Sequence, residues 1–339
     1  MEQLNNQPIN NDIQQFMAIF KKKGKLWYRW RKNCIRKMAI QVSPSYRDFV
    51  NKVLSNTKLK VTHSGQGYCL PSYDFSENMS KRMKTQIAFD YCESRTFLHE
   101  LSHSIDFLFG RPRSLSCNVI VQDGKTLRDI FDEEFKQHHK ELREFIMNEY
   151  RSNIDSNIHA GAYDIFINNM PKYLTLCKCQ DKKQRKALQD ELYKCGFVEV
   201  YYQIATKSCF KILNQKYLAI LDALSAIYPI DGLFLLGHEK GYYQIDAERP
   251  VYEFFANVCA DKLMGNQYRY DQLIKLMPKS FNAFERLFVL IYDNIQNNKR
   301  FTNLPLIPYV EPEWDDDMDT EEEQEEAKAW TTKSSLIKK

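Results

Sequence analysis

Apolar residues recur at every third or fourth position over much of this chain, a spacing that is typical of amphipathic helices. The periodicity predicts helices over residues 94–108, 131–151, 183–217, 250–261 and 267–300. Residues 86–91 predict a strand, and residues 65–71, which contain two glycines and a proline, predict a turn and an edge segment. We therefore predict a mainly α-helical α+β fold with a small antiparallel β-sheet.

The distribution of charge divides the chain into three parts. We expect residues 1–55 to form a basic, aromatic-rich helical arm, residues 56–304 to form the globular domain, and residues 305–339 to form a C-terminal tail. Within the tail, residues 311–326 carry eleven acidic and no basic side chains, so the rest of the chain is far more basic than the net charge of +4 indicates. A run this acidic is typical of a disordered, self-repelling segment.

The most informative motif lies in the first of the predicted helices. His99, Glu100 and His103 form the pattern H-E-x-x-H, and residues four apart lie on the same face of a helix. Both imidazoles can therefore bind one metal ion, while the carboxylate of Glu100 can take a proton from a water molecule held there. The pattern is typical of zinc hydrolases. The alternative is a solvated polar stripe on an amphipathic helix.

A catalytic zinc ion usually has three protein ligands, so we searched the chain for a third. The metzincin pattern would need a glycine and a histidine where this chain has Asp106 and Phe109, which excludes that class. Glu253 is the best candidate, because it lies on a predicted helix that begins near Pro250 and it shares one face with alanines. A carboxylate in so apolar a helix is costly to bury unless it is paired or bound to metal. The alternative is a glutamate at the solvent edge.

Two segments of the sequence together resemble a known family. Residues 96–106 and 253–257 resemble the gluzincin metallopeptidases of the anthrax lethal factor type. They are still more similar to zincin-like domains in minor head, or head-morphogenesis, proteins of phages from Gram-positive bacteria, a group that residues 221–232 and 237–243 also fit. The resemblance implies a zincin-like fold, with residues 126–228 as a helical insertion between the H-E-x-x-H helix and the glutamate helix.

The same resemblance implies a metal site and a reaction. One Zn²⁺ ion per chain would be held by His99, His103 and Glu253, with Glu100 as the general base of a metallopeptidase. The substrate would be a peptide or protein, and phage head or portal proteins are expected partners. We expect synthesis in the cytoplasm of a bacterial host and association with the virion. The main alternative is a structural minor head protein with a non-catalytic zincin-like core.

Further residues complete the predicted site. An aromatic hydroxyl or a histidine often faces the metal and stabilises the oxyanion, and Tyr243, Tyr242 and His238 are the candidates, with Tyr243 preferred. Many gluzincins have an acidic residue four positions after the zinc glutamate, where this chain has Asn257. Asn257 can still accept a hydrogen bond from a ligand imidazole, and Asp106 is a second candidate for that orienting role.

The basic arm suggests a different function. Lysines and arginines interleaved with aromatic residues can contact phosphates while the rings stack on bases, or can bind an anionic membrane surface. In the alternative without a binding function, the aromatic rings pack inward and the charges face water. The residues concerned are Lys21, Lys22, Lys23, Lys25, Trp27, Arg29, Trp30 and Arg31. A nucleic-acid-binding protein is therefore a further candidate function.

Several other residues are weaker candidates for metal ligands. His138, His139 and His159 lie among charged residues, as is typical of a solvated helix face. The nine cysteines show no disulfide framework, and the spacing of Cys177 and Cys179 with Cys195 is unlike that of a zinc knuckle. We find no signal peptide and no apolar run long enough for a transmembrane segment.

Overall fold

The computed structural model describes a defined part of the chain, namely residues 11–23, 25–61, 68–70, 86–89, 94–107, 114–207, 209–228, 242–243, 247–299 and 304–307. Residues 1–306 form one compact unit, and residues 307–339 form a second unit of which the structure describes Ile307 alone. The predicted acidic tail therefore lies outside the described residues, apart from its first three positions. The boundary predicted after residue 55 does not separate compact units.

The N-terminal helices belong to the same hydrophobic core as the rest of the first unit. They are α1 (Asn11–Lys23), α2 (Lys25–Gln41), a short 3₁₀ turn η2 (Pro44–Tyr46) and α3 (Arg47–Asn56). The rings of Phe16 and Phe20 on α1 contact Phe97, with ring centroids 6.2 and 5.5 Å apart. Burial of such rings removes large apolar areas from water, which explains why this segment packs inward rather than forming a free arm.

The sheet is mixed rather than wholly antiparallel. Strand β3 (Gln86–Phe89) lies at its centre, parallel to β1 (Lys58–Val61) and antiparallel to β2 (Tyr68–Leu70). The chain between β1 and β3 is long enough for the crossover that a parallel pair needs, and β2 pairs with the opposite edge of β3. A separate antiparallel hairpin joins β4 (Ile120–Gln122) to β5 (Lys125–Thr126). The strand predicted before the H-E-x-x-H helix is confirmed.

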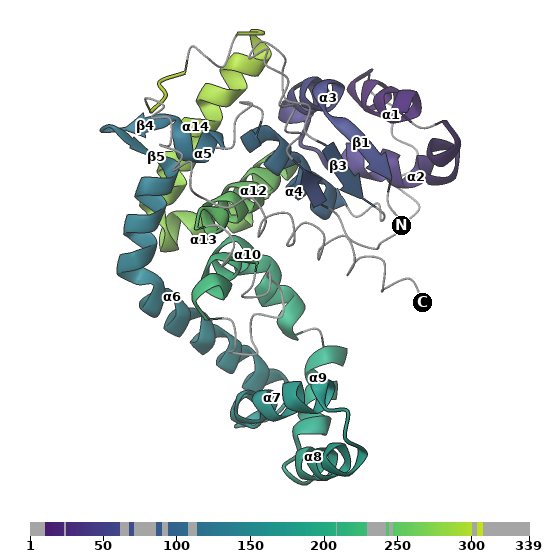
Figure 1. Cartoon of the computed structure of the whole chain (residues 1–339), viewed down its shortest axis with the longest axis vertical. Helices are drawn as coiled ribbons and strands as arrows, with labels where there is room; N and C mark the ends of the chain where they lie inside the picture. The colour runs from purple at the N-terminus through teal and green to yellow at the C-terminus, as the bar shows by residue number, and fades with distance from the viewer. Residues whose placement is uncertain are drawn as a thin grey trace, which may run out of the picture. The chain divides into compact units, whose positions relative to one another are not determined.

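Two helices form the centre of the first unit. Helix α4 (Ser94–Asp106) carries the H-E-x-x-H motif, and α12 (Arg249–Met264) carries Glu253 and has Pro250 in its first turn. They pack directly against each other (Figure 1). Every residue of α12 from Val251 to Asp261 is buried, as expected for a helix in the core of a protein.

The chain between these two helices is largely helical, as predicted. It comprises α5 (Leu115–Asn118), the hairpin, α6 (Leu127–Asn157), α7 (Ala162–Lys178), α8 (Lys182–Lys194), α9 (Phe197–Thr206) and α10 (Cys209–Ile227). The helical pattern over residues 183–217 is interrupted at Gly196, whose backbone is left-handed, with a φ of 76°. This conformation changes the direction of the chain between α8 and α9. Helices α7, α8 and α9 contact one another (Figure 1), and α10 returns the chain to α12.

Two polar contacts fix the long helix α6. Thr126 and Asp129 form a reciprocal capping box at its start. Further along, the buried carboxylate of Glu134 accepts hydrogen bonds from the backbone N–H groups of Lys279 and Ser280, at 3.0 and 2.7 Å. These N–H groups belong to the first turn of α14 (Pro278–Gln296), which follows α13 (Gln267–Leu276). Glu134 therefore attaches the insertion to the C-terminal helices. None of the described helices combines the length and apolar character needed to span a bilayer.

Candidate metal centre

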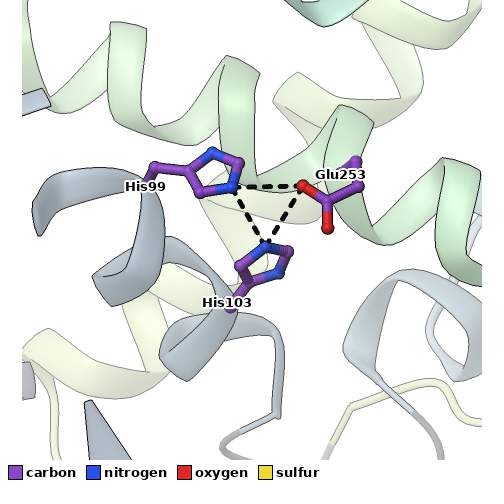
Figure 2. Close-up of side chains that lie close together, drawn as sticks. All are labelled: His99, His103 and Glu253. Atoms are coloured by element: carbon purple, nitrogen blue, oxygen red, sulfur yellow. Dashed lines mark hydrogen bonds and ion pairs between the residues drawn. The ribbon is translucent and has the colours of Figure 1, made fainter. Parts of the chain in front are cut away.

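Three potential ligands converge where α4 crosses α12. The Nε2 atoms of His99 and His103 lie 3.1 and 3.4 Å from Oε2 of Glu253, and 3.2 Å from each other (Figure 2). Among the described residues, this is the one group of three or more His, Cys, Asp or Glu side chains that could hold a metal ion. The helical spacing of four residues places both imidazoles on one face of α4, and the small residues of α12 allow its carboxylate to approach them.

Because Glu253 and His103 are both buried, the charge on each depends on the charge on the other. Glu253 is 1% exposed and His103 is 8% exposed. Burial alone opposes the charge on each, but the nearby imidazoles, chiefly that of His103, hold the pKa of Glu253 well below its usual value. In turn, although burial lowers it, the Glu253 carboxylate raises the pKa of His103 to about 9. Without a metal, His103 is therefore protonated at neutral pH and compensates the buried carboxylate.

The donor set and its spacing fit a zinc ion. Two imidazole nitrogens and one carboxylate oxygen are a common catalytic zinc set, and tetrahedral ligands at zinc distances lie about 3.3 Å apart. The three separations in this cluster, 3.1, 3.2 and 3.4 Å, are close to that value. The residues present therefore fit the cofactor that the sequence predicts.

Glu100 is buried beside the ligands, at 8% exposure. Its charge raises the pKa of His103, which shows that the two groups are close enough to interact. No other described residue forms a hydrogen bond or ion pair with its carboxylate. A general base must be free to accept a proton, and no described side chain competes for this carboxylate.

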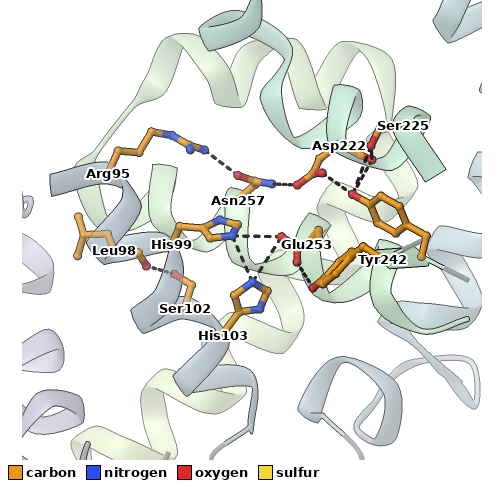
Figure 3. Close-up of polar contacts among 11 residues, drawn as sticks. Arg95, Leu98, His99, Ser102, His103, Asp222, Ser225, Tyr242, Glu253 and Asn257 are labelled. Carbon is orange, nitrogen blue, oxygen red and sulfur yellow. Dashed lines mark hydrogen bonds and ion pairs between the residues drawn. The ribbon is translucent and has the colours of Figure 1, made fainter. Parts of the chain in front are cut away.

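The two adjacent tyrosines have different partners. The Tyr242 hydroxyl donates to Oε1 of Glu253 at 2.6 Å, which leaves Oε2 facing the imidazoles (Figure 3). The hydroxyl of Tyr243, the preferred candidate, donates instead to the Asp222 carboxylate. Burial, and then the charge of Glu253, raises the pKa of Tyr242 well above its usual value, so that it remains a donor. Tyr242 thus contacts the ligand cluster directly, and the third candidate, His238, lies outside the described residues.

The two residues predicted to orient a ligand histidine bind other groups. Oδ1 of Asn257 accepts from Nη2 of Arg95 at 2.8 Å, and its Nδ2 donates to Asp222 at 3.1 Å (Figure 3). Asp106 accepts from the backbone N–H and the hydroxyl of Ser116, at 2.8 and 2.9 Å. Neither side chain is hydrogen-bonded to a ligand imidazole in the described part of the chain, so the orienting role stays a prediction. The Nδ1 atoms of both ligand histidines lack a hydrogen-bond partner in the described part of the chain.

The charged residues that surround the metal ligands on α4 and α12 were not predicted from the sequence. Arg95 binds Asn257 and lies 3.6 Å from the Asp261 carboxylate, which also pairs with Arg269. Arg95 precedes His99 by four residues, so it lies on the face of α4 that carries the ligands, and this spacing was the available signal. Asp222 lies in a segment that the family resemblance includes, but its buried partners are far away in sequence.

The remaining candidate ligands lie outside the cluster. His138 contacts Glu141, a neighbour on its own helix, and His139 hydrogen-bonds to Tyr228 at 2.7 Å. The exposed His159 contacts a backbone carbonyl. Cys177, Cys179 and Cys195 do not belong to a metal-binding group among the described residues.

The basic arm is only partly described at the side-chain level. Lys21, Lys22 and Arg29 are exposed and Arg31 is half-buried, whereas the side chains of Lys23, Lys25, Trp27 and Trp30 lie outside the described part of the structure. The ring of Tyr28 packs against the core.

Comparison with known proteins adds no assignment. The chain matches no protein-family model, no curated protein and no solved structure.

Proposed function

We propose that this chain is a zinc-dependent metallopeptidase, with His99, His103 and Glu253 as the ligands of one zinc ion. The observation that carries the proposal is the convergence of three donor atoms, 3.1 to 3.4 Å apart, from two helices separated by about 150 residues of sequence. A buried carboxylate needs a compensating partner, and the two imidazoles that face Glu253 are groups that can also bind a metal ion. The resemblance to gluzincins supports the same interpretation.

The chain's own residues divide the chemistry between them. Bound zinc would supply a Lewis acid that polarises a scissile carbonyl and makes water acidic near neutral pH. Glu100 accepts the proton of the attacking water and passes it to the leaving amine. Its burial, and the absence of a competing partner among the described residues, keep it available for this role. Strand β2, at an edge of the sheet and in contact with α4, offers an edge along which an extended peptide substrate can pair.

Tyr242 has two roles in this proposal. Its hydrogen bond to Oε1 of Glu253 orients the ligand carboxylate so that a single oxygen faces the imidazoles. The same hydroxyl is a candidate donor to the oxyanion that forms when water attacks the peptide carbonyl, once its single proton turns away from Glu253. We assign this role to Tyr242 in preference to Tyr243, because the Tyr242 hydroxyl contacts a metal ligand whereas that of Tyr243 contacts Asp222.

Replacement of the general base tests the proposal. The variant Glu100→Gln should keep its metal but lose peptide hydrolysis by roughly 10³-fold, measured by mass spectrometry on a mixed peptide library. Glu144→Gln, at an exposed glutamate of α6, is the matched control and should retain full activity. A Glu100→Gln protein as active as the parent would exclude the mechanism.

One observation favours a second candidate, a phage minor head protein with a non-catalytic zincin-like core. The Nδ1 atoms of His99 and His103 lack the acceptor that usually orients ligand histidines in zinc enzymes, at least among the described residues. Cleavage of a co-expressed head or portal protein, lost in Glu100→Gln, would support the enzyme. Stable binding of these proteins without cleavage would support the structural role.

A further inference from the structure

Helix α2 and the end of α1 have a one-sided charge that the metal site does not explain. Between Asp12 and Asp48 the sequence has ten lysines and arginines and no acidic residue. Seventeen residues of this stretch form α2, a helix of about 25 Å. The charge is therefore carried on a regular, extended element of the first unit.

One face of α2 is committed to the core. Ile35, Met38 and Ala39 are 0, 1 and 2% exposed, and α2 contacts both α1 and α4. The ring of Tyr28 also packs against this core. The helix is thus anchored by its apolar side, which fixes the direction of the residues on its other side.

The other face presents cations to water without neutralisation. Lys21, Lys22, Arg29, Lys32 and Lys37 are exposed, and none of them pairs with an acidic side chain in the described part of the chain. Some exposed cations elsewhere do pair, as in the contact of Arg151 with Asp164 at 2.8 Å. The lysines of α8 that form no ion pair among the described residues share their helix with Asp190 and Glu191, whereas the stretch from Asp12 to Asp48 has no acidic residue between its ends. An unneutralised row of cations attracts a polyanion and gains free energy by releasing its counterions.

The burial of residues on α2 distinguishes between the two polyanions that the basic arm could bind, namely an anionic membrane and nucleic acid. A helix that lies on an anionic membrane must insert its apolar face between the lipids. The described apolar residues Ile35, Met38 and Ala39 of α2 are already buried in the protein and cannot insert into lipid, whereas its described cations face water. The packed ring of Tyr28 is likewise not available to stack on a base. These features favour contact with phosphates alone, which carries no sequence information.

We propose that the cationic face of α2, with the end of α1, binds the phosphate backbone of nucleic acid without sequence preference. The proposal is independent of the proposed peptidase, because none of these residues belongs to the metal centre.

Salt dependence tests the electrostatic part of the proposal. Binding of the full chain to two unrelated 20-base-pair DNA duplexes is measured by fluorescence anisotropy. Contacts to about four phosphates should weaken the affinity roughly 100-fold between 50 and 200 mM salt, equally for both duplexes. An affinity that is independent of salt, or that differs about tenfold between the duplexes, would overturn the proposal.

Charge reversal tests the location of the surface. The variant with Arg29→Glu, Lys32→Glu and Lys37→Glu should bind DNA at least roughly 30-fold more weakly, with unchanged helix content and metal content. The matched control reverses Lys182, Lys183 and Lys186, three exposed lysines of α8, and should lose less than about threefold. Equal losses in both variants would overturn the proposal. So would binding to phosphatidylserine vesicles combined with no binding to DNA.

Discussion

Helices α12 and α8 both carry charged residues, but they stand at opposite extremes of burial. In α12 every residue from Val251 to Asp261 is buried, whereas in α8 only Leu192 is. The charges of α8 are solvated, and the one ion pair of its Glu191, with Lys172, lies at the surface. Each polar group of α12 instead has a specific partner: Glu253 has the two imidazoles, and Asn257 and Asp261 share Arg95.

The difference teaches where a charged residue is informative. Water stabilises an exposed charge, so the lysines of α8, which share their helix with Asp190 and Glu191, do not by themselves indicate a function. A buried charge persists only if the fold supplies a partner, and the partners therefore outline a site. The comparison predicts large effects for substitutions on α12 and negligible ones on α8.

The largest effect is expected for Glu253→Gln in the metal-free protein. The substitution removes the anion that raises the pKa of His103 and leaves the buried imidazoles without their counter-charge. We expect the free energy of unfolding to fall by roughly 3 kcal/mol, as for other buried pairs that lose one partner. Urea denaturation in the presence of a chelator at pH 7 measures this change. A loss below about 1 kcal/mol would show that the pair is not the buried ion pair described above.

The next effect is a dependence of metal affinity on pH. His103 has a pKa of about 9 in the folded, metal-free chain, against the usual 6.5. The protonated imidazole therefore stabilises the fold fully below pH 6.5, and this contribution to stability is lost as the pH rises through 9. Zinc binds the neutral imidazole and must displace that proton. Zinc affinity should therefore rise about tenfold per pH unit between pH 7 and 9 and then level off. Competition with a chelator of known pH dependence measures it, and a constant affinity across this range contradicts the assignment.

A smaller effect separates the two tyrosines. Tyr242→Phe removes the hydrogen bond to Oε1 of Glu253 and should weaken zinc binding about 10- to 100-fold. Tyr243→Phe removes a bond to Asp222 instead, so we expect less than about a threefold change in zinc affinity. The same competition titration compares the pair. A larger effect of Tyr243→Phe on zinc affinity would contradict the assignment of Tyr242 as the tyrosine that orients Glu253.

The smallest effect is expected on α8. Glu191→Gln breaks a solvent-exposed contact to Lys172, in which the hydrogen bond between the two groups raises the pKa of Lys172 and lowers the pKa of Glu191. We expect the urea midpoint and the zinc content to remain those of the parent. A clear destabilisation by this variant would show that the distinction between the two helices is too simple.

Much of the fold and the ligand set could be predicted from local patterns. The helical period placed α4 and α12, and the spacing of His99 and His103 follows directly from helix geometry. The third donor, Glu253, could be chosen because a carboxylate among apolar residues is conspicuous. Such features depend on neighbours in the sequence, which is why they can be recognised without a structure.

The parts that were missed depend on distant contacts. The parallel pairing of β1 with β3 arises from a crossover that leaves no periodic signal. The partners of Asn257 and Asp106 could not be predicted, because Arg95, Asp222 and Ser116 compete for them in three dimensions. Likewise, nothing in the pair Tyr242 and Tyr243 indicates which hydroxyl faces Glu253.

The zinc content of the purified chain, measured beside His99→Ala and Glu253→Ala, tests the central claim most directly. We predict about one zinc ion per parent chain and loss of the ion in both variants, since each removes one of three ligands. Zinc retained in Glu253→Ala would show that α12 does not supply the third ligand. A parent chain that takes up no zinc, even when zinc is supplied during refolding, would contradict the metal site itself.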